Sequence, residues 1–513
     1  MKIARMPTCI PLATGLAILA ATANAQSPSP GPAPADPMLD AAVTIDFNLP
    51  RGVFLHPERY NNIGRWSNNT PLRNDDVNFF NEQGLHGKIY RVWVITETVY
   101  DPKTGNYSYE GLDDYLADMS RLSDELLVVL DTRESMGKIG RTPAEIKPFV
   151  TTIMRDLKRK YPKIKYIEAF NEPDHNSREL VKPDQLYEYY RIYYQAVNEV
   201  NRELKPAVPL LLGGPVTGTC GSPWAPPGPN NLQWIPKFLD SYAADRDPDK
   251  RLDFLSYHVY GYFNDQVNCK DYVPIRSDPS QLAGKREEID GWLQQRGIDV
   301  SIPSFITETG PYPGPSYDDK ANPHADYIRQ ASGMASYMYW HMENPKNVPF
   351  NWVMRHNSDE RKDQLITRAG IDGKTPLTRT FSPYGNSMAM MAMLKDERVG
   401  ARSNALQAGK GVYAIATKDG SGAAVMLWNY QQSATQTYQV AIDMGQLPAT
   451  LRGKRLRQRT YSIDDKVSNY WGNTHTANLQ QMSDRALSSR QKHTVTVNLA
   501  PNAFQLIVLE PER

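Results

Sequence analysis

The stretch Tyr166-Ile167-Glu168-Ala169-Phe170-Asn171-Glu172-Pro173 places a short, mostly apolar run directly before two polar residues and a proline. Such a run is typical of a buried β-strand, and the proline that follows cannot donate a ladder hydrogen bond. Residues 142–161 before it and 183–204 after it have the amphipathic spacing of helices. A strand between two helices indicates a parallel sheet, because parallel strands need a crossover connection.

The same strand and helix unit recurs along most of the chain. Eight apolar, β-branched runs begin near Gly52, Lys88, Glu125, Tyr166, Pro209, Asp253, Pro303 and Val348. Further helical stretches between them are residues 232–243, 280–296 and 325–341. Eight such units predict an α/β fold, a (β/α)8 barrel. The alternative is an open, doubly wound sheet, which would show a glycine-rich phosphate loop where this chain has Leu55-His56-Pro57.

Two glutamates stand at the ends of predicted strands. Glu172 ends the fourth strand, and Glu308 ends the seventh, after Phe305-Ile306-Thr307. In a (β/α)8 barrel the carboxyl ends of the strands surround the pocket, so both acids should reach it. Such a pair suits hydrolysis of a glycosidic bond, in which one acid protonates the leaving oxygen and the other attacks the sugar or activates water. The Asn-Glu-Pro tripeptide alone is weak evidence; its position strengthens it.

Charge and motif content exclude several other classes of function. The chain has 58 Lys and Arg residues against 57 Asp and Glu residues. This near-neutral balance gives no electrostatic basis for binding nucleic acid or an anionic membrane. The sequence contains no zinc, phosphate-loop or nucleophile-elbow pattern. We therefore predict no metal and no cofactor.

The first residues are typical of a targeting segment. Lys2 and Arg5 precede an apolar run over residues 10–21, and Ala23-Asn24-Ala25 has the small-x-small form of a cleavage site. We predict a signal peptide over residues 1–25, cleaved after Ala25, and a secreted or periplasmic protein without a membrane anchor. Residues 26–40 are rich in proline and predict an extended linker.

The mature chain would keep two cysteines, Cys220 and Cys269, since Cys9 lies in the signal peptide. In an oxidising compartment these two are expected to form a disulfide. They follow the fifth and sixth predicted strands, so their loops would be neighbours at one end of the barrel. Two unpaired thiols are the alternative.

The pattern changes after about Leu394, so we predict the barrel over residues 41–394 and a second domain over 395–513. The second part has apolar or alternating runs at residues 411–417, 423–430, 437–444, 456–463 and 494–509. The turn Asp419-Gly420-Ser421-Gly422 would join two of them as a hairpin. These runs predict an accessory antiparallel β-sandwich, to which residues 43–47 add a strand. A packing role for this domain is favoured over glycan binding because no aromatic platform is evident.

A barrel with Asn171-Glu172 at the fourth strand and Glu308 at the seventh resembles glycoside hydrolase clan A, and is most like family 39. That family includes β-xylosidases, α-L-iduronidases and exopolysaccharide glycosidases. Residues 253–260 are similar to its sixth strand, residues 502–509 are similar to the last strand of its accessory sandwich, and the likeness covers most of residues 40–513. The resemblance implies a retaining mechanism with Glu172 as acid/base and Glu308 as nucleophile.

Two departures from the xylosidases of this family leave the substrate open. Those enzymes usually carry tryptophan where this chain has Phe170, and an aromatic residue where it has Thr309. The resemblance also makes Arg91, in the second strand, a candidate to hold Glu308 ionised; a structural ion pair at the barrel mouth is equally compatible.

Further residues are expected to bind substrate. Asn171 would bond the 2-hydroxyl of the sugar. His258 and Tyr260 alternate along the sixth strand, so both point the same way and either hold Glu308 or a hydroxyl, or fill the barrel interior. Trp352, in the eighth strand, would stack on a sugar ring or belong to the core.

The sequence thus predicts a secreted retaining glycoside hydrolase that acts on a plant or bacterial polysaccharide or oligosaccharide, β-xylosidase-like or an exopolysaccharide glycosidase. The predicted partner is a carbohydrate substrate, and the oligomeric state is left open. One alternative is a non-catalytic glycan-binding protein on the same barrel. Others are an α-L-arabinofuranosidase or endo-glycanase of the same clan, a transglycosidase and a glycan lyase.

Overall fold

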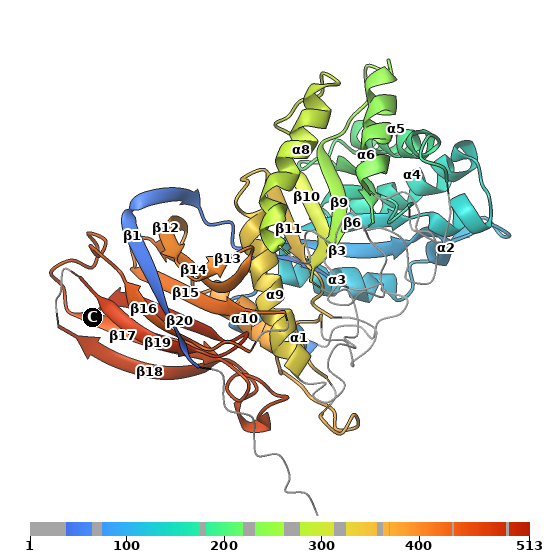
Figure 1. Cartoon of the computed structure of the whole chain (residues 1–513). Helices are drawn as coiled ribbons and strands as arrows, with labels where there is room; N and C mark the ends of the chain where they lie inside the picture. The colour runs from blue at the N-terminus through green and yellow to red at the C-terminus, as the bar shows by residue number, and fades with distance from the viewer. Residues whose placement is uncertain are drawn as a thin grey trace, which may run out of the picture. The chain divides into compact units, whose positions relative to one another are not determined.

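The computed structural model describes residues 37–63, 74–174, 181–218, 231–260, 278–311, 325–355, 363–368, 370–432, 435–488 and 492–512. They form a closed barrel of eight parallel strands and a ten-stranded, mostly antiparallel sheet (Figure 1). The predicted (β/α)8 barrel with an accessory β-sandwich is confirmed. No helix in these ranges is both long and apolar enough to span a bilayer.

The barrel closes because its last strand pairs with its first. In order around the barrel, the strands are β2 (Tyr60–Asn62), β3 (Gly87–Ile95), β6 (Ser123–Asp131), β7 (Ile164–Ala169), β8 (Leu211–Thr217), β9 (Phe254–Tyr260), β10 (Ser304–Gly310) and β11 (Asn347–Asn351). The helices are α1 (Asn74–Glu82), α2 (Thr96–Val99), α3 (Leu112–Leu122), α4 (Pro143–Lys160), α5 (Leu186–Leu204), α6 (Asn231–Ala244), α8 (Leu282–Gln294), α9 (Ala325–His341) and α10 (Pro383–Met391). A two-stranded sheet pairs β4 (Tyr100–Asp101) with β5 (Asn106–Tyr107).

Local sequence explains where the helices begin. At the start of α4, the Thr142 hydroxyl accepts from the backbone of Glu145, whose carboxylate accepts from the backbone of Thr142. Pro143 stands at the first helical position, where its missing N–H costs nothing. This capping box satisfies two otherwise unpaired N–H groups and fixes the direction in which α4 leaves the loop after β6.

The first barrel strand was placed wrongly from the sequence. Gly52 and Val53 end the long strand β1 of the other sheet, and the first barrel strand is the short, polar β2. Asn62, on β2, donates to the carbonyls of Thr307 (2.6 Å) and Asn351 (3.2 Å). Because side-chain amides hold this strand inside the barrel, it has no apolar pattern from which it could be recognised.

The second sheet combines one strand that precedes the barrel with strands that follow it. Its strands are β1 (Leu39–Val53), β12 (Glu397–Ser403), β13 (Leu406–Gln407), β14 (Lys410–Lys418), β15 (Ala423–Tyr430), β16 (Tyr438–Asp443), β17 (Leu456–Ile463), β18 (Gln480–Leu487), β19 (Thr494–Leu499) and β20 (Phe504–Pro511). Strand β1 pairs antiparallel with β12 and parallel with β16. Residues 43–47 therefore lie within the C-terminal sheet, as the sequence predicts.

The central strands of this sheet are buried on both faces. On β14, Val412 and Ala414 face the interior of the sandwich, and Tyr413 belongs to the same core as the barrel helices. The indole of Trp428 on β15 donates to the Ser336 hydroxyl of α9 (2.8 Å). Strands β14 and β15 thus contribute to two cores, one inside the sandwich and one against the barrel.

We expect residues 40–394 alone to be unstable. Cutting after Leu394 removes both partner strands of β1 and uncovers the α9 side chains Tyr339 and Trp340, whose rings contact Tyr413 of β14. The truncated chain should aggregate, or unfold at least about 10 °C below the full chain. Solubility and thermal unfolding measure this. A soluble, fully active fragment as stable as the full chain would show that the sheet is a separable module.

Candidate active site

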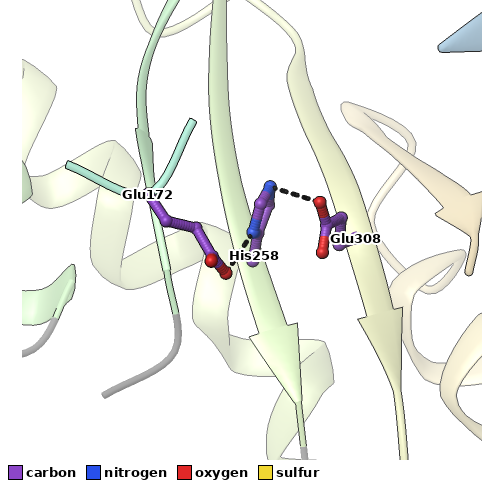
Figure 2. A group of neighbouring side chains, drawn as sticks. All are labelled: Glu172, His258 and Glu308. Atoms are coloured by element: carbon purple, nitrogen blue, oxygen red, sulfur yellow. Dashed lines mark hydrogen bonds and ion pairs between the residues drawn. The ribbon is translucent and has the colours of Figure 1, made fainter. Parts of the chain in front are cut away.

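The structure brings the predicted site residues together at the carboxyl ends of the barrel strands. Asn171 and Glu172 lie just beyond β7, after Phe170, and Glu308 lies on β10. His258, on β9, stands between the two acids (Figure 2). The remaining candidates are Arg91 on β3, Tyr260 on β9 and Trp352 directly after β11.

One histidine bridges the two glutamates. His258 Nδ1 lies 3.0 Å from Glu172 Oε1, and its Nε2 lies 3.6 Å from Glu308 Oε1 (Figure 2). One carboxylate oxygen of each glutamate and a ring nitrogen of His258 all lie within 4.8 Å of one another. The two acids therefore face a common space, with an imidazole touching both.

Glu308 is held at both oxygens. Its Oε1 accepts from Arg91 Nη1 at 2.7 Å, and its Oε2 accepts from the Tyr260 hydroxyl at 2.7 Å. Burial, followed by the charge of Glu308, raises the pKa of Tyr260 well above its usual value, so the phenol stays a donor. These bonds fix the direction of the Glu308 carboxylate.

Arg91 links several parts of the site. Burial alone would lower the pKa of its guanidinium, but the carboxylates of Glu168 and Glu308 outweigh burial and raise it. Its Nη2 also donates to Asn171 Oδ1 at 2.7 Å. Arg91 thus contacts Glu308 and is also part of a buried ion-pair network. That it keeps Glu308 ionised stays a prediction.

The two acids also act on His258. Complete burial would lower the pKa of the imidazole, but the charge of Glu308 and the hydrogen bond to Glu172 raise it above 6.5, against a smaller opposing effect of Arg91. His258 therefore carries a proton over more of the neutral range than an isolated histidine. A proton can be shared between its Nδ1 and Glu172.

The backbone around Glu172 is strained. Phe170, Glu172 and Val216 have φ angles of 53°, 44° and 54°, in the left-handed region that residues with a Cβ avoid, most of all β-branched ones. The backbone N–H of Glu172 donates to the Val216 carbonyl at 2.9 Å, which ties the strained turn after β7 to β8. Strain of this kind persists only where the surroundings hold it, and it is common at functional sites.

Gly218 and Asp174 pack beside Glu172. A Cβ on Gly218 would lie 3.1 Å from both Cγ and Oε1 of Glu172. The Gly218 N–H donates to Asp174 Oδ1 at 2.6 Å. Burial, with a smaller effect from the Glu172 charge, raises the pKa of Asp174 to about 7. The absence of a side chain at Gly218 leaves room for the Glu172 carboxyl.

We expect Gly218→Ala to displace Glu172. The added methyl group should shift its carboxyl by a few tenths of an ångström and loosen its bond to His258. Activity on substrates with poor leaving groups should fall about tenfold or more. The matched control is Gly291→Ala in α8, where nothing lies within 4 Å of the added carbon. Equal kinetics for the two variants would contradict this role of Gly218.

Trp352 lies in the barrel interior. It is 8% exposed and belongs to a cluster with Trp93 and Tyr260, its ring centroid 6.4 Å from that of Trp93. The Arg91 guanidinium in turn lies 5.0 Å from the centre of the Trp93 ring. The stacking of Trp352 on a sugar stays a prediction.

Several site-forming residues were not predicted from the sequence. Glu168 is a fully buried acid on β7, and the single signal for it is an acid inside the apolar run Tyr166 to Phe170. Arg133 forms a buried ion pair with Asp131 (2.7 Å), and its guanidinium lies 5.7 Å from the centre of the Trp93 ring. Cys220 and Cys269 lie outside the described residues, so their disulfide stays a prediction, as does the signal peptide.

Glu172, His258 and Glu308 are also the one group of three possible metal ligands found in the described part of the chain. Two cationic side chains oppose a metal ion there. Arg91 contacts Glu308 directly, and the charges of Glu172 and Glu308 contribute to the raised pKa of Arg133. We assign no metal to this group.

Comparison with known proteins supports the resemblance seen in the sequence. A family model described as the glycosyl hydrolase catalytic core matches residues 147–274, which include Glu172 and His258. No curated protein matches the chain.

Solved structures share the fold at low sequence identity. A GH39 enzyme from Xanthomonas axonopodis pv. citri is 14% identical, with a TM-score of 0.63 over 92% of this chain and 97% of that chain. A glucosidase from Croceicoccus marinus is 14% identical, with a TM-score of 0.65 over 93% and 99%. A monomeric β-xylosidase from Caulobacter crescentus is 14% identical, with a TM-score of 0.61 over 92% and 100%. The resemblance to clan A and family 39 is confirmed in fold, and together with the family model it supports a glycoside hydrolase.

Proposed function

We propose that this chain is a secreted, retaining glycoside hydrolase that cleaves a plant or bacterial polysaccharide or oligosaccharide through a covalent intermediate on Glu308. One observation carries the proposal: carboxylate oxygens of Glu172 and Glu308 lie within 4.8 Å of each other at the ends of β7 and β10. Retaining glycosidases keep their carboxyl groups about 5 to 5.5 Å apart, whereas inverting enzymes need about 6.5 to 9.5 Å to admit a water. The short separation supports retention.

In the first step, Glu308 attacks the anomeric carbon while Glu172 protonates the leaving oxygen. Arg91 and Tyr260 keep the Glu308 carboxylate charged and aimed. The proton for the leaving group lies in the hydrogen bond between Glu172 and His258. The step yields a glycosyl ester on Glu308 and a released alcohol.

In the second step, Glu172 acts as a base. It removes a proton from a water molecule, and the water oxygen attacks the same anomeric carbon and displaces the Glu308 carboxylate. Two inversions give net retention. The same glutamate serves as acid and then base because its proton is lost in the first step and regained in the second.

Asn171 is suited to the 2-hydroxyl of the bound sugar. The Arg91 guanidinium carries only hydrogen-bond donors, so the Asn171 oxygen must be the atom that accepts from it. The amide N–H₂ is then left as the donor, and no acceptor for it appears among the contacts of the described residues. Such a bond strengthens as the transition state forms.

For the substrate we propose a β-xyloside-like or exopolysaccharide glycoside. Both departures from the xylosidase pattern are buried: Phe170 packs edge-on against Tyr193, and the Thr309 hydroxyl lies 3.0 Å from His341 Nε2. Neither side chain is exposed to a sugar, so these departures do not argue against such a substrate.

A panel of aryl glycosides and plant and bacterial polysaccharides tests the proposal. We expect release of the aryl alcohol from at least one glycoside. Binding of a glycan without turnover of any substrate would identify a glycan-binding protein. Products that absorb in the ultraviolet through a new double bond would identify a lyase.

A further inference from the structure

Beneath the two proposed catalytic glutamates lies a third acid, Glu168, which no step of the reaction uses. It is the penultimate residue of β7 and is fully buried. Its Oε2 accepts from Arg91 Nε at 2.5 Å, and its Oε1 accepts from the hydroxyls of Thr307 (2.7 Å) and Ser256. These donors satisfy both oxygens of the buried carboxylate, whose charge is one of the two that raise the pKa of Arg91.

Glu168 and Glu308 share one cation. The Arg91 guanidinium donates through Nε to Glu168 and through Nη1 to Glu308, while Nη2 holds Asn171. The three residues at the centre of this network, Arg91, Glu168 and Glu308, are each at most 4% exposed. Water therefore screens their charges little, and a change of charge on one acid acts on the other through Arg91.

The proposed reaction changes one of these charges. When Glu308 becomes a glycosyl ester it loses its negative charge, and Arg91 loses one of its two anionic partners. Glu168 has no exposed surface with which to contact a substrate, so its charge remains throughout. Arg91 is thus paired in the free enzyme and in the covalent intermediate alike.

We propose that Glu168 is a positioning residue, a permanent counter-ion that keeps Arg91 in place throughout the reaction and whose negative charge helps set the pH at which Glu308 becomes an active nucleophile. This inference rests on the proposed glycosidase reaction. Other charged or titratable groups also face this network from the neighbouring elements. They include Glu172 after β7, His258 and Tyr260 on β9, Arg133 after β6 and Tyr115 on α3.

The variant Glu168→Gln separates charge from shape. A glutamine fits the same contacts, since its oxygen can accept from Arg91 and its amino group can donate to the Thr307 and Ser256 oxygens. The fold should therefore survive, which thermal unfolding checks. With Glu168 neutral, the whole charge of Arg91 acts on Glu308. The acidic limb of kcat/KM should move to lower pH, and kcat/KM at its optimum should fall about tenfold.

The matched control is Glu125→Gln. Glu125 is also an acid on a barrel strand, but it pairs with Lys165 (2.7 Å) at the opposite end of β6. This variant should keep the wild-type pH profile. A folded Glu168→Gln protein whose acidic limb coincides with the wild type would overturn the inference and leave Glu168 a structural residue.

A second measurement does not depend on activity. The His258 ring lies 3.5 Å from Arg91 Nη2, so neutralising Glu168 should make the Arg91 charge more repulsive to a protonated imidazole. An NMR titration, with the His258 signal assigned by its loss in His258→Gln, should give a lower midpoint in Glu168→Gln. An unchanged midpoint contradicts the inference. Absence of wild-type turnover would overturn the proposed function, and the titration would still decide the role of Glu168.

Discussion

Replacing Glu308 by glycine should reduce activity at least about 10⁴-fold, even for aryl glycosides with excellent leaving groups. The carboxylate that forms the glycosyl ester is then gone, and Arg91 and Tyr260 lose the group that they orient. Azide can enter the vacated space and attack the anomeric carbon once, so it should restore turnover and give a glycosyl azide of inverted configuration. Product configuration by NMR measures this.

A circular-dichroism melt controls for misfolding in this variant, because glycine also adds backbone freedom within β10. Near-wild-type activity without azide would remove Glu308 from the role of nucleophile. A rescued product of retained configuration would do so as well.

Replacing Glu172 by alanine should have an effect that depends on the leaving group. Substrates with poor leaving groups need a proton, so their kcat/KM should fall about 10² to 10⁴-fold. Activated aryl glycosides leave without one and should form the glycosyl ester at nearly the wild-type rate, as a burst of released phenol. The second step then lacks its base, and azide should accelerate it and yield a glycosyl azide of unchanged configuration.

The comparison between substrates serves as the control for this variant. A misfolded protein would lose activity on every substrate alike, whereas loss of a general acid follows the acidity of the leaving alcohol. An equal fall for activated and unactivated substrates in a folded protein would contradict the role of Glu172.

The fold could be predicted well where burial gives a regular pattern. Strand β15, strand β17 and helix α9 have the bounds that the sequence indicates, since apolar side chains mark their buried faces or positions. The failures have physical causes. Strand β2 is held by its own side-chain amides, since Asn61 and Asn62 donate to backbone carbonyls. Strand β18 is largely exposed. Neither strand therefore shows a hydrophobic period.

The residues of the candidate site likewise fall into those that a local sequence pattern marks and those that it does not. Glu172 and Glu308 could be predicted because each follows an apolar run that must be a strand. A role for Glu168 could not be assigned, because it depends on hydrogen bonds from Arg91 and Thr307, which lie on strands far away in the sequence. The link from Arg133 through Trp93 to Arg91 likewise depends on the closure of the barrel and has no local signature.

The most direct test of the account is the anomeric configuration of the first product formed by the wild-type protein. Proton NMR of an early time course, on any glycoside that the chain turns over, observes the hemiacetal before it equilibrates in water. The short separation of Glu172 and Glu308 predicts that this hemiacetal has the configuration of the substrate. A first product of inverted configuration would contradict the covalent intermediate on Glu308, whatever the sugar.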